Sequence, residues 1–81
     1  MEERKKNPMK QLAMQLAHAL DDQKRIMEED LREHQIEEIR AYHSQVIDEI
    51  WKKGYDIQTM LSLADEYKIL SWDNYIEWVY N

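Results

Sequence analysis

Residues 9–53 read MKQLAMQLAHALDDQKRIMEEDLREHQIEEIRAYHSQVIDEIWKK and contain neither proline nor glycine. Most of them are residues that lose little free energy on entering a helix, such as alanine, leucine, methionine, glutamate and lysine. The flanking residues give clear ends, because Asn7 can cap a helix that starts at Pro8, and Gly54 suits the position just after a helix. The sequence therefore predicts one long helix over residues 8–53.

Two short helices are predicted after this stretch. Asp56 can cap a helix over about residues 57–69, and Ser71 can cap another over about residues 72–80. No segment alternates as a half-buried strand would, so the predicted fold class is all-α. We expect both short helices to fold back on the C-terminal half of the long helix. The apolar face of the last helix is expected to consist of Trp72, Tyr75, Ile76 and Val79.

The length of the predicted helix constrains how the chain is organised. A straight helix over residues 8–53 would be about 68 Å long, whereas a compact chain of this size has a radius of gyration of about 12 Å. We therefore expect three parts: a flexible basic N-terminus at residues 1–7, a projecting amphipathic arm at residues 8–35, and a three-helix unit at residues 36–81.

In this interpretation, no other part of the same chain packs against the apolar stripe of the projecting arm. Burying a leucine or methionine side chain contributes roughly 1.5–3 kcal/mol, so a second copy of the chain is expected to cover the stripe in a homodimer. The alternative is a bend near Asp21–Asp22 that lets residues 8–20 fold back, which the lack of turn residues there disfavours. The expected oligomer interface comprises Met9, Leu12, Ala13, Leu16, Leu20, Met27 and Leu31.

Composition narrows the classes of function. The chain has a formal net charge of −6, no cysteine, no apolar run long enough to span a membrane and no signal-peptide pattern, so we expect a soluble cytoplasmic protein. Residues 54–81 contain five acidic residues, a single lysine and six of the eight aromatic residues. Such a surface suits a basic or apolar protein partner and repels a phosphate backbone.

Chemistry-bearing patterns are weak throughout the chain. A single glycine excludes a glycine-rich phosphate loop, and the serines have no recognisable histidine and acid around them. We therefore predict no enzyme activity, no cofactor and no metal site. The two histidine–carboxylate groups at helical spacing are interpreted as solvated side-chain pairs: His18 with Asp21 and Asp22, and His34 with Glu37 and Glu38.

The sequence thus favours a non-enzymatic protein–protein interaction module, a regulator or inhibitor that binds a larger, unidentified protein and works as a homo-oligomer. The candidate partner-binding residues are Trp72, Asp73, Glu77, Trp78 and Tyr80. The alternative is a nucleic-acid-associated accessory protein that contacts phosphates through its basic N-terminal arm, with Arg4, Lys5, Lys6 and Lys10. The overall acidity disfavours binding to nucleic acid or to an anionic membrane.

Overall fold

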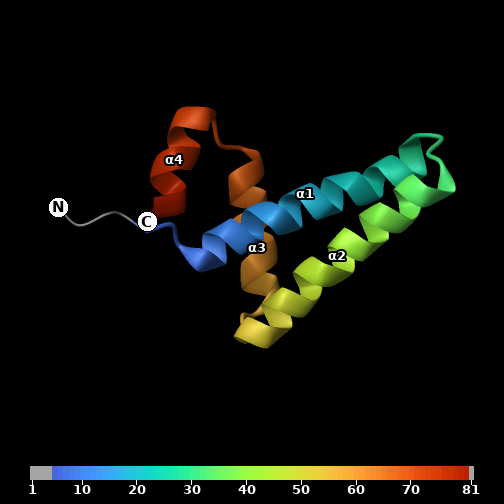
Figure 1. The fold of residues 1–81 in the computed structure, drawn as a ribbon. Coiled ribbons are helices and arrows are strands. Elements are labelled where there is room, and N and C mark those ends of the chain that lie inside the picture. The colour runs from blue at the N-terminus through green and yellow to red at the C-terminus, as the bar shows by residue number, and fades with distance from the viewer. Residues whose placement is uncertain (1–4, 81) are drawn as a thin grey trace.

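The computed structural model describes residues 5–80 of the chain, which form four helices (Figure 1). No strand occurs among these residues, so the predicted all-α fold class is confirmed. In chain order, the helices are α1 at Pro8–Glu28, α2 at Glu33–Lys53, α3 at Ile57–Lys68 and α4 at Trp72–Tyr80.

Most helix ends lie where the sequence placed them, because each has a local side-chain or backbone signal. The Asn7 side chain accepts hydrogen bonds from the backbone N–H groups of Met9 at 3.0 Å and Lys10 at 3.3 Å. Asp56 accepts a hydrogen bond from the Thr59 N–H at 3.0 Å in the same way. Gly54 ends α2 with a φ of 71°, the left-handed conformation that glycine adopts without strain.

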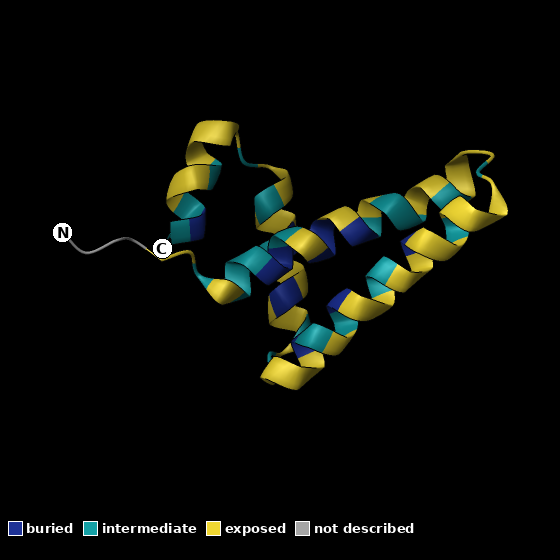
Figure 2. Cartoon of the chain, in the orientation of Figure 1, coloured by how far each residue is buried: buried dark blue, intermediate teal, exposed yellow. Residues whose placement is uncertain are grey.

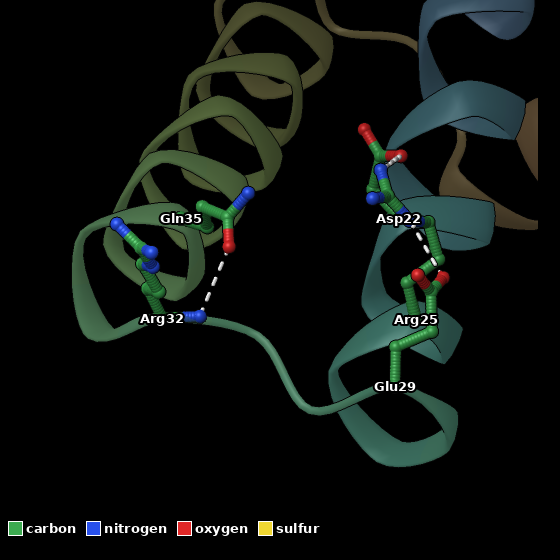
Figure 3. Close-up of polar contacts among 5 residues, drawn as sticks. All are labelled: Asp22, Arg25, Glu29, Arg32 and Gln35. Atoms are coloured by element: carbon green, nitrogen blue, oxygen red, sulfur yellow. Dashed lines mark hydrogen bonds and ion pairs between the residues drawn. The ribbon is translucent and has the colours of Figure 1, made fainter.

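The prediction of one helix over residues 8–53 is wrong. The helix breaks at residues 29–32, where Glu29 has an extended backbone with φ −118° and ψ 152°. The chain then turns, and α2 starts after Arg32, whose backbone N–H donates to the Gln35 side-chain oxygen at 2.9 Å (Figure 3). The break also lies beyond Asp21–Asp22, where we had considered a bend, because those two residues are inside α1.

Polar side chains support the end of α1 on the side that borders α2. The Arg25 guanidinium donates to the carboxylates of Glu29 at 2.9 Å and Asp22 at 3.5 Å (Figure 3). All three side chains are well exposed, and exposed ion pairs contribute little to stability. The turn therefore depends on what the two helices bury against each other.

The core explains why the chain turns at residues 29–32. A straight helix would leave the N-terminal apolar stripe in water, whereas the turn places it against other helices of the same chain (Figure 2). The core joins α1, α2 and α3 across the boundary that we had expected at residue 35. Its buried residues are Leu12, Ala13, Leu16 and Ala17 from α1, Val46 and Ile50 from α2, and Met60 and Ala64 from α3.

Helices α3 and α4 are held against α1, which corrects our expectation that they fold back on the C-terminal half of a long helix. The Tyr67 hydroxyl of α3 lies 3.0 Å from His18 Nε2, and Lys68 forms an ion pair with Asp21 at 3.4 Å. At the far end of α4, the Asn7 N–H donates to the Val79 carbonyl at 2.7 Å. Helix α1 is therefore the central element of the fold rather than a projecting arm.

The shape of the molecule follows from this arrangement. The α1–α2 hairpin extends beyond α3 and α4 and ends in the turn at residues 29–32 (Figure 1). The overall extents are 48 × 29 × 24 Å and the radius of gyration is 14.1 Å. The longest dimension is shorter than the roughly 68 Å that an unbroken helix over residues 8–53 would require.

Candidate interaction surface

Three large apolar side chains are exposed around the turn between α3 and α4. Ile69 is 85% exposed, Trp72 is 72% exposed and Ile76 is 43% exposed. Ile69 follows the last residue of α3, whereas Trp72 and Ile76 lie one turn apart on α4. We name these three residues the α3–α4 surface. Large exposed apolar side chains that are close in sequence are candidates for an interaction site.

A hollow of about 400 Å³ lies beside Trp72. It is bounded by residues of α1, α3, α4 and the connection between the last two helices. Its volume falls in the range of roughly 300–1,000 Å³ that is typical of ligand pockets, so it is large enough for a side chain of a partner. The lining residues are Asp21, Tyr67, Lys68, Leu70, Ser71, Trp72 and Tyr75.

Aromatic contacts hold the wall of this hollow in place. The rings of Trp72 and Tyr75 lie 5.5 Å apart at an angle of 31°, and Tyr75 contacts Tyr67 edge-on at the same centroid distance. The Tyr75 hydroxyl also donates to the Met14 sulfur at 3.0 Å, which ties α4 to α1. The wall therefore needs little ordering when a partner binds.

Burial raises the pKa of the Tyr67 hydroxyl above its ordinary value of 10.0, and the nearby Tyr75 and Asp21 add to the effect. Because the folded protein disfavours the phenolate, the stabilising contribution of neutral Tyr67 is complete below about pH 10 and is lost as the pH rises through the folded pKa.

We therefore expect the free energy of unfolding to fall above about pH 10. Urea denaturation at several pH values, on the wild-type protein and Tyr67→Phe, measures this effect. Tyr67→Phe loses the hydroxyl contact with His18 at every pH, so its stability differs from that of the wild-type protein throughout. The quantity to compare is therefore the slope of the free energy of unfolding against pH. Identical slopes in the two proteins would contradict the assignment to Tyr67.

The predicted partner-binding residues do not all lie on one surface. Trp72, Asp73 and Glu77 are exposed, whereas Trp78 and Tyr80 are partly buried. Trp78 packs against the core, and the Lys10 ammonium lies 5.2 Å from the centre of its ring. The inner face of α4 thus includes Trp78 and the fully buried Val79, and our expectation that Trp72 and Ile76 face inward is wrong.

The residues predicted for the oligomer interface have different environments. Leu12, Ala13 and Leu16 are buried within the single chain, so their burial no longer requires a second copy. Met9, Leu20 and Leu31 are partly buried, and Met27 is 90% exposed. Homodimer formation remains a prediction.

The basic residues at the N-terminus gain neighbours that the sequence did not indicate. Arg4 lies outside the described residues, Lys5 and Lys6 are exposed, and Lys10 lies over Trp78. Because α1 and α2 pair side by side, Lys53 at the end of α2 borders the same groove as Pro8 at the start of α1. Asn7, which we had assigned to a flexible segment, is bound to both α1 and α4.

A metal site requires grouped ligands, and a membrane-spanning helix requires a long apolar stretch. Among residues 5–80, no three histidine, aspartate or glutamate side chains are grouped so that they could hold a metal ion. His18 pairs with Tyr67 rather than forming a cluster with carboxylates. No helix in this part of the chain is long and apolar enough to cross a membrane.

Comparison of the chain with protein-family models, curated proteins and solved structures finds no match. The surface of the molecule is therefore the basis for a proposal on function.

Proposed function

We propose that this chain is a non-enzymatic helical module that binds another protein through the α3–α4 surface. The observation that carries the proposal is the 72% exposure of Trp72 beside a preformed hollow. Tryptophan is among the residues that contribute most to binding energy at protein interfaces. A small helical chain of this kind would act as a regulator or inhibitor by occupying the surface of a larger protein.

Self-association is a separate part of the proposal. The chain already buries Leu12 and Leu16 by itself, so the burial of these two residues does not require a dimer. Among the residues predicted for the oligomer interface, Met27 is the one whose side chain stays largely in water. It is 90% exposed near the end of α1. Lys68 borders both the depression around Met27 and the hollow beside Trp72, so these two surfaces adjoin.

Partner capture by matched tryptophan variants tests the proposal. Trp72 and Trp51 are equally exposed, at 72% and 71%, but Trp51 lies at the end of α2. With the tagged full-length protein and a lysate of the cells that make it, Trp72→Ala is expected to reduce capture of the specific partner at least about tenfold. Trp51→Ala is expected to leave capture unchanged. Equal capture by the Trp72→Ala variant and the wild-type protein would contradict the proposal.

The alternative function is contact with nucleic acid through the basic end, but the groove that brings Lys53 near Pro8 also contains Glu49, so it adds no net positive charge. Salt dependence separates the two functions, because a protein that binds phosphates loses affinity steeply as salt rises. Binding through Trp72 and its apolar neighbours is expected to weaken less steeply with salt, because salt screens charge pairs and leaves apolar contacts in place.

A further inference from the structure

The outward face of α4 carries two adjacent stripes of different chemistry. Trp72 and Ile76 form an apolar stripe, and Asp73 and Glu77 form an acidic stripe of exposed residues beside it. Residues four apart lie on the same face of a helix, one turn from each other, so the two stripes run in parallel. Ile69 adds a third exposed apolar side chain close to the start of α4.

Two lysines lie near α4: Lys68, which precedes it in the chain, and Lys10, whose ammonium is 5.2 Å from the centre of the Trp78 ring. Lys68 is the single lysine among residues 54–81, and no arginine occurs there. Its ammonium nitrogen lies 3.4 Å from the carboxylate of Asp21, so Lys68 already has an acidic neighbour. Among residues 5–80, neither Asp73 nor Glu77 forms an ion pair. The acidic stripe is therefore free to attract positive charges of a partner.

We infer that the occupant of the α3–α4 surface is a basic amphipathic helix of another protein. Its apolar side chains would pack on Trp72 and Ile76, one of them entering the hollow, and its lysine or arginine residues would face Asp73 and Glu77. A helix that lays an apolar face on a groove is a common mode of peptide recognition. This inference rests on the proposed function, because it specifies the partner of the same surface.

Two synthetic helical peptides of about 14 residues test the charge of the partner. Both have the same leucine spacing and a fluorescent label, but one has lysine and the other glutamate at the polar positions. Titration into the full-length protein, followed by fluorescence anisotropy, is expected to show at least about tenfold tighter binding of the lysine peptide. Equal affinity for the two peptides would overturn the inference.

Matched charge variants locate the binding site. Asp73→Asn with Glu77→Gln is expected to weaken binding of the lysine peptide about three- to tenfold. Glu37→Gln with Glu38→Gln removes the same charge from exposed positions of α2, on the protruding hairpin, and is expected to change the affinity by less than about twofold. An equal effect of both pairs would mean that the peptide is attracted by net charge alone, which would overturn the inference.

Variants of the exposed tryptophans separate this inference from the proposed function. Trp72→Ala is expected to abolish binding of the lysine peptide, and Trp51→Ala to preserve it. If Trp72→Ala reduces partner capture but the two peptides bind equally, the inference fails and the proposed function stands. If Trp72→Ala changes neither measurement, both fail.

A second copy of the chain is the other occupant that the α3–α4 surface could have. Sedimentation of the protein alone tests this alternative. A dimer that Trp72→Ala converts to monomer would place a second copy of the chain on the α3–α4 surface, which would overturn the inference. The inference is supported if the wild-type protein and Trp72→Ala have the same oligomeric state and the wild-type protein binds the lysine peptide selectively.

Discussion

Leu16→Ala is expected to lower the free energy of unfolding by about 2–5 kcal/mol, by the same amount at every protein concentration. Leu16 is 1% exposed and belongs to the core cluster that also contains Val46 and Ile50 of α2. Removing its side chain leaves a cavity inside one chain, so the loss is not coupled to association. Urea denaturation at two protein concentrations that differ about tenfold measures both the size and the concentration dependence of the loss.

Leu61→Ala is the matched control, because Leu61 is 41% exposed on α3. Its expected cost is clearly smaller than that of Leu16→Ala, since Leu61 keeps 41% of its surface exposed in the folded protein. A destabilisation by Leu16→Ala that grows as the protein concentration rises would place Leu16 between two chains, as the sequence alone suggested, because association stabilises the wild-type protein more at higher concentration.

The helix ends could be predicted from the sequence because their signals are local. A capping side chain such as Asn7 or Asp56 satisfies backbone groups two or three residues away, so neighbouring residues alone determine the site. Gly54 is equally local, since its left-handed φ of 71° is a property of one residue. These signals mark the start of α1, the end of α2 and the start of α3. The start of α4 follows Ser71, whose hydroxyl oxygen accepts a hydrogen bond from the Asn74 N–H at 3.4 Å.

The turn at residues 29–32 could not be predicted because its cause is not local. Glu29, Asp30, Leu31 and Arg32 include no glycine or proline, and helix propensities differ by only a few tenths of a kcal/mol for most residues. The gain comes from burying Leu12 and Leu16 against helices that follow in the chain. Tertiary packing therefore overrides the local preference for a continuous helix.

The inward face of α4 could be predicted only in part: Val79 is buried and Tyr75 is partly buried, whereas Trp72 and Ile76 are exposed. Two apolar stripes are possible on this short helix, one with Trp72 and Ile76 and one with Trp78, and each has helical spacing. The contacts of α4 with α1 decide between them, because the Asn7–Val79 hydrogen bond and the Tyr75–Met14 contact set its rotation. Asp73 and Glu77 were found as candidates because exposed charges are recognisable from composition.

The two tryptophans of α4 are expected to respond differently to replacement by alanine. Trp78 packs on the core and lies over Lys10, with its ring 6.1 Å from that of Tyr67, so Trp78→Ala is expected to cost about 2–3 kcal/mol. Trp72 is 72% exposed, so Trp72→Ala is expected to cost less than about 1 kcal/mol. Thermal and urea denaturation of the two variants under the same conditions measure the difference.

Partner capture is expected to fall more in Trp72→Ala than in Trp78→Ala, which is the reverse of the order expected for stability. Trp72→Ala removes the exposed anchor beside the hollow, so it should abolish binding while the fold persists. Trp78→Ala should reduce binding only to the extent that it unfolds the protein, and cooling the sample to a temperature where the variant is folded should restore capture. If capture instead stays low in folded Trp78→Ala and normal in Trp72→Ala, the partner surface lies at the Lys10–Trp78 contact and not at the α3–α4 surface.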